Sequence, residues 1–182
     1  MAQAQKAKKA ILTVCCMFFF FAMTSSSLYA IDSELTRQTL LNIRGVMVVV
    51  EDLQPNIQKY AHRFGLTRDQ LKKDIEQRLI KSGIIVLDQE RWLKTPDRPV
   101  PYININTHEY EKYWYAYNII VDLRQLVRLE ANPDMKALAS TWSVNMVGIA
   151  NIGSLNTVKN NAGILVDRFI EARQPPPALK GK

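Results

Sequence analysis

The chain has 182 residues, with 24 lysines and arginines against 17 aspartates and glutamates, which gives a formal net charge of +7. Three lysines and no acidic residue lie in the first thirty positions, so removing that segment lowers the charge by three, to +4. Both cysteines, Cys15 and Cys16, also lie there. Without the segment the chain has no thiol, which excludes disulfides, cysteine-ligated zinc and a cysteine nucleophile.

The first thirty residues have the pattern of a secretory signal peptide. Basic Lys6, Lys8 and Lys9 precede an apolar run over residues 11–24, and the stretch SSSLYA ends at the small residue Ala30. The run is too short for a membrane span of roughly 20 residues. The sequence therefore predicts export, with cleavage near Ala30, no stable membrane span afterwards and a periplasmic or secreted location. A retained N-terminal anchor is the alternative.

The next segment predicts one short helix and one strand. Residues 31–44 favour a helix capped by Ser33. The run VMVVV, residues 46–50, is rich in β-branched side chains and predicts a central strand, which ends in Glu51 and Asp52. Pro55 then separates this strand from the next element.

The strongest helix pattern begins at Thr67, whose hydroxyl can cap the helix while Gln70 returns a bond, as in a capping box. Gly83 fits the left-handed residue that ends a helix. Residues 84–87 are continuously apolar and predict a strand buried on both faces. The helix carries an apolar stripe of Leu71, Ile75 and Leu79 and two predicted i,i+4 ion pairs, Asp69 with Lys73 and Asp74 with Arg78.

Strand, helix and strand in this order predict a parallel pair with a right-handed crossover. Residues 88–101 contain three prolines and predict a loop. In the stretch YININ, residues 102–106, Ile103 and Ile105 alternate with polar or amphipathic side chains, which predicts a half-buried strand.

The second half of the chain predicts two long strands and a helix. Apolar side chains alternate along residues 113–129, a turn-rich connection follows at 130–139, and residues 141–150 predict an antiparallel strand. Ser154 is the expected cap of a last helix, whose apolar side runs over residues 155–169.

Together these elements predict an α/β (α+β) fold, a two-layer mixed sheet of about five strands with two main helices on one face. We expect one domain over residues 31–172, followed by a flexible proline-rich tail at 173–182.

Three carboxylates are the candidates for a metal site. Glu51, Asp52 and Asp88 follow two predicted parallel strands, and such strand ends meet at one edge of a sheet. A cluster of oxygen ligands would suit Ca²⁺ or Mg²⁺. Capping bonds to loop N–H groups, or pairs with lysine and arginine, are the structural alternative.

Two further features are candidates for partner binding. Trp92 lies in the predicted loop, and loops carry recognition more often than strands do. Asn104, Asn106 and His108 form a polar row that could bind a polymer such as a glycan, although a solvated strand face is the simpler explanation of the row.

No catalytic motif is present. His62 and His108 have no second histidine or cysteine near them in sequence, and an ordinary surface role accounts for both. The chain has no nucleophile elbow, zinc-protease motif, P-loop or dinucleotide fingerprint, and we expect no cofactor. Its basic residues are dispersed among acids, which argues against nucleic-acid binding.

Several segments between residues 45 and 170 form a recognisable set: Gly45 with VVVEDL, then GLT, LIKSGIIVL, PYININ, ASTWS, Val147-Gly148 and VDRFI. They resemble a family of small secreted bacterial proteins without assigned function. Because that family has no known site residues, the resemblance assigns none to this chain. The order of elements is more loosely similar to envelope α/β domains, namely the amino-terminal domain of TolB, the outer-membrane lipoprotein LpoB and the curli secretion protein CsgG. That similarity implies an assembly or adaptor role. Unlike the lipoproteins, this chain lacks a convincing lipobox.

The sequence therefore favours a non-enzymatic periplasmic or secreted domain that binds a protein or polymer of the cell envelope through sheet edges and the Trp92 segment. The alternative is an envelope hydrolase or a divalent-metal-dependent enzyme that uses the strand-end carboxylates.

Overall fold

The computed structural model of the protein describes residues 32–174. The predicted signal peptide, and all of the predicted tail except Arg173 and Gln174, lie outside the described residues. Within residues 32–174 no helix is long and apolar enough to cross a membrane. The elements in chain order are α2 (Glu34–Gln38), β1 (Gly45–Val46), β2 (Val49–Val50), α3 (Pro55–Ala61), the short 3₁₀ helix η1 (His62–Phe64), α4 (Arg68–Lys81), β3 (Ile85–Val86), α5 (Gln89–Lys94), β4 (Val100–Glu111), β5 (Trp114–Leu129), β6 (Asn132–Asn151) and α6 (Asn156–Ala172).

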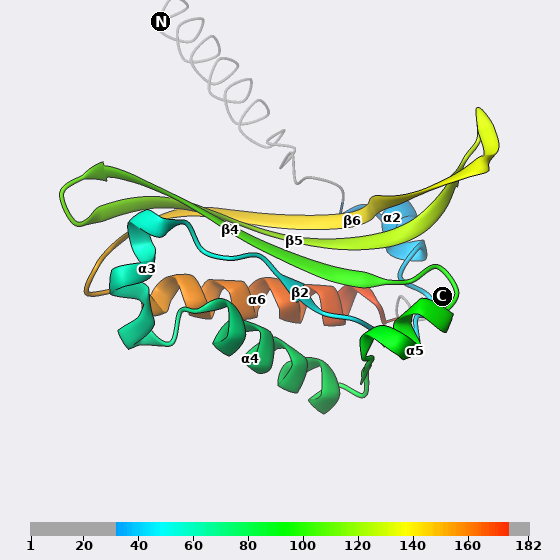
Figure 1. Cartoon of the computed structure of the whole chain (residues 1–182), viewed down its shortest axis with the longest axis horizontal. Coiled ribbons are helices and arrows are strands. Elements are labelled where there is room, and N and C mark those ends of the chain that lie inside the picture. The colour runs from blue at the N-terminus through cyan, green and yellow to red at the C-terminus, as the bar shows by residue number, and fades with distance from the viewer. Residues whose placement is uncertain (1–31, 175–182) are drawn as a thin grey trace, which may run out of the picture.

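The protein has two layers (Figure 1). One is a four-stranded sheet in the order β2-β4-β5-β6, in which β2 runs parallel to β4 and the other neighbours are antiparallel. The second layer consists of α3, α4 and α6, which lie on the same face of that sheet. A mixed sheet with helices on one face confirms the predicted α/β (α+β) class.

The β-branched run after Gly45 forms two strands instead of the single one predicted. β1 pairs in parallel with β3 in a separate two-stranded sheet, whereas β2 pairs with β4. Between β1 and β2 the backbone N–H of Met47 donates to the carbonyl of Pro99 (3.2 Å). The predicted parallel pair around α4 is therefore present as β1 and β3, but the chain changes sheet in the middle of the run.

α4 begins as predicted at Thr67, whose hydroxyl accepts a hydrogen bond from the backbone N–H of Gln70 (3.3 Å). The return bond of a capping box does not form, because the Gln70 amide donates to Asp74 instead (2.7 Å). The predicted apolar stripe is confirmed, since all three of its side chains are buried: Leu71, Ile75 and Leu79.

The charged side of α4 is bound to α6. Asp74 pairs with Lys159 (2.7 Å) and Arg78 pairs with Asp167 (2.7 Å), in place of the predicted bond between Asp74 and Arg78. Partial burial would raise the pKa of Asp74, but the hydrogen bonds from Lys159 and Gln70 outweigh it and the pKa lies below its usual value. These bonds hold the two main helices side by side.

Gly83 ends α4 in the left-handed conformation, with φ at +80°. Its N–H donates to the carbonyl of Ile80 (3.0 Å) and that of Ile84 donates to the carbonyl of Leu79 (2.9 Å), which are the two bonds of a Schellman motif. The strand that follows is not buried on both faces as predicted, because Ile85 is 54% exposed. A short apolar run alone does not define which of its side chains are covered.

Replacing Gly83 with valine is expected to lower the free energy of unfolding by about 1–2 kcal/mol, because a β-branched residue is strained at positive φ. No atom lies within 4 Å of the position that a Cβ would occupy, so a steric clash adds nothing to this cost. Urea unfolding measures the loss, with Gly83→Asn as the control because asparagine tolerates the left-handed region. Equal stability of Gly83→Val and wild type would show that the helix stop is not specified by this glycine.

Residues 88–101, predicted to be a loop, contain the helix α5. The helix starts at Asp88, whose carboxylate accepts a hydrogen bond from the backbone N–H of Arg91 (2.8 Å). It ends before Pro96, because a proline disfavours helical geometry in the residue that precedes it. All three prolines follow the helix, so the predicted loop is confined to the segment between α5 and β4.

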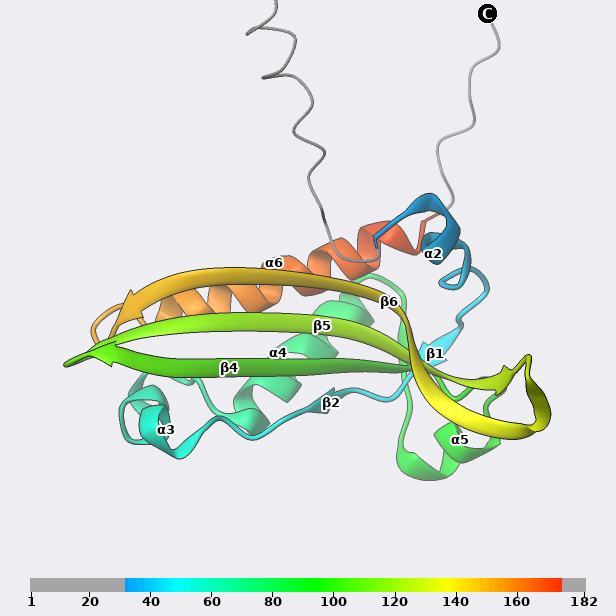
Figure 2. The same cartoon turned by 90° about the horizontal axis from the view of Figure 1, so that it is seen from above.

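The three long strands form two consecutive hairpins, which Figure 2 shows from above. β5 and β6 pair along almost their whole length. Residues 130–139, predicted to be a turn-rich connection, belong to β6 except for a turn at Glu130 and Ala131. Pro133 is tolerated there because β6 is an edge strand and a proline needs no ladder partner on the free side.

The core lies between the sheet and the helices. The predicted alternation is confirmed, since the inward-facing side chains of β4 and β5 are buried: Ile103, Ile105, Tyr115, Tyr117, Ile119, Val121 and Leu123. α6 buries its predicted apolar side against them. Its start differs from the prediction, because the Ser154 hydroxyl bonds to Asn151 and the helix begins after Leu155 without a side-chain cap.

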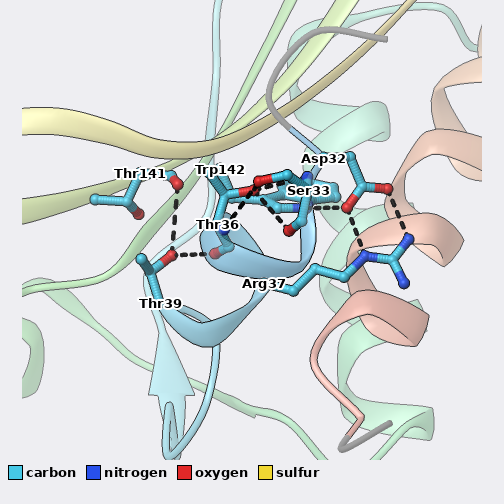
Figure 3. Close-up of polar contacts among 7 residues, drawn as sticks. All are labelled: Asp32, Ser33, Thr36, Arg37, Thr39, Thr141 and Trp142. Atoms are coloured by element: carbon cyan, nitrogen blue, oxygen red, sulfur yellow. Dashed lines mark hydrogen bonds and ion pairs between the residues drawn. The ribbon is translucent and has the colours of Figure 1, made fainter. Parts of the chain in front are cut away.

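A polar cluster joins the N-terminal end of the described chain to β6 (Figure 3). The indole N–H of Trp142 donates to Asp32 (2.9 Å), and Arg37 donates two bonds to the same carboxylate (2.6 and 2.8 Å). The hydrogen bond from Arg37 keeps the pKa of Asp32 below its usual value, against the effect of burial. Ser33 caps α2 as predicted, in a reciprocal pair of bonds with Thr36. We call Asp32, Arg37 and Trp142 the N-terminal clasp.

Candidate functional site

One face of the four-stranded sheet points away from α3, α4 and α6, and no helix of the described chain covers it (Figure 1 and Figure 2). We call it the outer face. The strand register places its side chains in rows that run across the sheet. The rows are Val49, Tyr102, Asp122 and Ser143; Glu51, Asn104, Ile120 and Asn145; Asn106, Asn118 and Val147; and His108, Ala116 and Ile149.

The half of the outer face along β2 and β4 carries a chain of hydrogen-bonded amides. Asn104 donates to Glu51, Asn106 donates to Asn104, and Gln54 donates to Asn106 (2.9 Å). The side-chain amide oxygen of Gln54 accepts in turn a hydrogen bond from the Thr107 hydroxyl (2.8 Å). We call these four residues, Glu51, Gln54, Asn104 and Asn106, the amide ladder. Because each member fixes the next, the ladder presents its remaining polar groups in a defined order along the strand.

On the β6 side of the outer face, the end of the strand that carries Val147 and Ile149 is apolar, whereas Ser143 and Asn145 earlier in the strand are polar. Val147 is 73% exposed and Ile149 is 60% exposed. The two side chains are neighbours on one face, because residues two apart in a strand point the same way. The outer face therefore combines the hydrogen-bonding groups along β4 with two exposed aliphatic side chains at one end of β6.

The basic group at one end of the outer face is already bound. The Arg124 guanidinium lies 3.3 Å from the centroid of the Tyr102 ring, a cation–π contact, and 3.8 Å from the Asp122 carboxylate. Arg124 and Asp122 therefore offset each other's charge, which leaves Glu51 as the carboxylate of these four rows that has no cationic partner within residues 32–174.

The three carboxylates proposed as a metal site do not form one. Glu51 accepts from Asn104, and Asp52 pairs with Arg68 (3.2 Å). Asp88 lies at the other sheet, after β3, where it caps α5 and pairs with Arg91 (2.8 Å). Within residues 32–174 no group of three or more histidine, cysteine, aspartate or glutamate side chains is placed to hold a metal ion. The prediction of shared strand ends was wrong because β1 and β2 belong to different sheets.

The environment of Asp88 is that of a structural cap. The backbone N–H of Arg91, and then its guanidinium, lower the pKa of this carboxylate below its usual value. A carboxylate held in its charged form by a helix end is suited to stabilising that end.

The remaining candidates lie apart from one another. Trp92 lies in α5, half-buried under the Arg98 guanidinium, which is 5.9 Å from its ring centroid. Its indole N–H has no acceptor among the described residues. His62 is exposed in η1, and His108 is exposed on the outer face at the far end of β4. The structure thus links Asn104 and Asn106 to Glu51, places His108 on the same face at the far end of β4, and leaves Trp92 and His62 elsewhere.

No family model matches the chain, and no curated protein matches it. The outer face is therefore assigned from its own chemistry.

Proposed function

We propose that the protein is a non-enzymatic binding or adaptor domain of the cell envelope, periplasmic or secreted, and that its outer face binds another envelope protein. The location is supported by the signal-peptide pattern of the first thirty residues. A binding role is favoured over metal-dependent catalysis because the carboxylates that such a reaction would need do not converge.

The exposure of Val147 and Ile149 on an uncovered sheet face is the observation that carries the proposal. Covering an aliphatic side chain of this size contributes roughly 1.5–3 kcal/mol. Because no helix among residues 32–174 covers the outer face, that contribution is available to a partner. Two such side chains at neighbouring positions form the apolar centre that an interface needs.

The amide ladder supports a protein partner with defined hydrogen-bonding groups. Glu51, Asn104 and Asn106 lie on the same face as Val147 and Ile149 and are separated from them by β5. Protein interfaces combine an apolar centre with a polar surround in this way. The ladder would then determine which partner binds, while the aliphatic side chains supply most of the affinity.

Site-specific photo-crosslinking in the producing cells tests the proposal. A photoreactive side chain at Val147 or at His108 is expected to give a discrete adduct with one envelope protein. The same side chain at Ile80, which is 60% exposed on the helix layer, is the matched control and is expected to give none. Adducts of equal yield at all three positions, or none at Val147 and His108, would contradict the proposal. An adduct that contains only this chain would not count in its favour.

A further inference from the structure

Among residues 32–174, β6 is a free edge of the four-stranded sheet, and most of its length is uncharged. From Ala137 to Asn151 it contains no aspartate, glutamate, lysine, arginine or proline. Proteins normally protect such edges with charges, prolines or very short strands, because unpaired backbone groups can pair with another strand. β2, at the opposite edge, has these protections, since it is two residues long and is followed by Glu51 and Asp52.

The free side of β6 is open over most of its neutral stretch. α2 approaches it at one point, where the Thr39 hydroxyl bonds to the carbonyl of Thr141 (3.5 Å). Residues 143–150 make no backbone hydrogen bond within the described chain other than those to β5. An open row of donors and acceptors about eight residues long is therefore available for strand pairing.

The helix beneath this edge has a matching feature. α6 lies under both β5 and β6, since Asn161 donates to the Tyr117 hydroxyl (2.7 Å) and the rings of Phe169 and Trp142 are in contact, with centroids 5.6 Å apart. Figure 2 shows α6 running along the β6 margin of the sheet. Ile164, at the middle of α6, is 46% exposed.

We infer that the free edge of β6 pairs with β6 of a second copy of this chain, antiparallel about a two-fold axis near Asn145, to give one continuous eight-stranded sheet. In a two-fold interface each residue near the axis meets its own counterpart. A charged strand would place like charges opposite each other, which is destabilising, and the neutral stretch avoids this. Asn145 lies next to the middle of that stretch.

The helix layer fits the same axis. Because α6 runs beneath β5 and β6, a two-fold axis perpendicular to the sheet at this edge places the α6 helices of the two copies next to each other. Their exposed midpoints, Ile164 and its counterpart, then meet near the axis and cover one another. Both layers thus present an uncharged centre at the position where identical residues have to meet. The dimer leaves the outer faces of both copies on one side, and it does not rest on the proposed function.

The mass of the purified protein in solution, measured by sedimentation or light scattering over a range of concentrations, tests the inference. Wild type is expected to have twice the mass of one chain. Asn145→Lys and Asn145→Glu are each expected to weaken dimerisation by at least about tenfold, because like charges meet at the axis. An equimolar mixture of the two variants is expected to restore the dimer, since opposite charges then meet.

Ile80→Lys is the matched control, because it adds the same charge at an exposed aliphatic position away from β6, and it is expected to remain dimeric. Ile164→Lys is an independent variant in the second layer and is also expected to dissociate the dimer. It provides the test if the Asn145 variants fail to fold. A monomeric wild type, or a dimer that resists both Asn145→Lys and Ile164→Lys, would overturn the inference. Loss of the dimer with partner adducts retained at His108 would separate this result from the proposed function.

Discussion

Replacing Trp142 with alanine is expected to lower the free energy of unfolding by about 3–5 kcal/mol, the largest single-residue effect we predict. The indole is fully buried, and it packs on Phe169 beneath the sheet. Truncation leaves a cavity that the paired strands on one side and α6 on the other cannot close. Urea unfolding near neutral pH measures the loss. It is followed by far-UV circular dichroism, because the variant lacks one of the three tryptophans and its fluorescence cannot be compared directly with that of wild type.

Trp142→Phe separates the packing from the hydrogen bond of the N-terminal clasp. Phenylalanine keeps an aromatic ring against Phe169 but removes the N–H that donates to Asp32. We expect most of the stability to remain, with a loss of about 1.5–3 kcal/mol at most, the range for a hydrogen bond to a charged group. If Trp142→Ala costs no more than Trp142→Phe, packing is not the source of the effect.

The clasp also makes stability depend on pH. The pKa of Asp32 in the folded protein is lowered, first by the hydrogen bond from Arg37 and also by that from Trp142. Its contribution is therefore complete above the unfolded pKa of about 3.9 and is lost as the pH falls through the lower folded value. Asp32→Asn should accordingly be less stable than wild type at neutral pH, and the difference should shrink under strongly acidic conditions. A difference that does not change with pH would contradict this account.

Replacing Gly148 with valine is expected to cost about 1–3 kcal/mol or more, because the side chain has no room. A Cβ at this position would lie 2.3 Å from the Tyr117 hydroxyl oxygen and 2.5 Å from the adjacent ring carbon. Tyr117 is buried on the facing strand and cannot move away without giving up its bond from Asn161. Thermal or urea unfolding measures the cost.

Gly153→Ala is the matched control, because the nearest atom to its Cβ would be 3.2 Å away, on the side chain of Asn151. We expect this change to stay within about 0.5 kcal/mol. A double variant that combines Gly148→Val with Tyr117→Leu should lose less than the sum of the two single variants, because the leucine vacates the space that the valine enters. Strict additivity would show that the glycine is not required by the tyrosine.

The elements that the sequence predicted best are those whose patterns are local. Thr67 marks the start of α4 and Gly83 its end, each through hydrogen bonds to residues within one turn. The alternation along β5 shows directly which side chains face the core. Such features need only the geometry of one helix or one strand. They were sufficient for the α/β class and for the inward-facing residues.

The predictions that failed concern segments whose secondary structure depends on contacts with distant parts of the chain. The run after Gly45 reads as one strand, but β1 and β2 take different partners, β3 and β4, and no local feature of the run indicates that exchange. Asn132 and Pro133 resemble a turn, yet they continue β6 because its outer edge needs no donor there. The three prolines of residues 88–101 concealed the capping residue Asp88 in front of them, although an aspartate followed by six helix-compatible residues was a usable indication.

The candidate site was predictable in part for the same reasons. Asn104 and Asn106 were identified from strand alternation, which correctly placed them on one face. Their link to Glu51 depends on the pairing of β2 with β4, and Gln54 reaches them from outside any strand. Val147 and Ile149 were within a predicted strand, but their exposure follows from the tertiary arrangement, in which no helix among residues 32–174 covers the outer face.

The N-terminal clasp has a consequence for the order in which the chain folds. Asp32 and Trp142 are 110 positions apart, whereas the β5–β6 hairpin closes through its own two-residue turn. Contacts between distant positions form slowly, because the intervening chain must first be brought together. We therefore expect the hairpin to form first and α2 to attach last. A chain that crosses a membrane from its N-terminus, as we propose, would keep α2 unattached until β6 had followed it through.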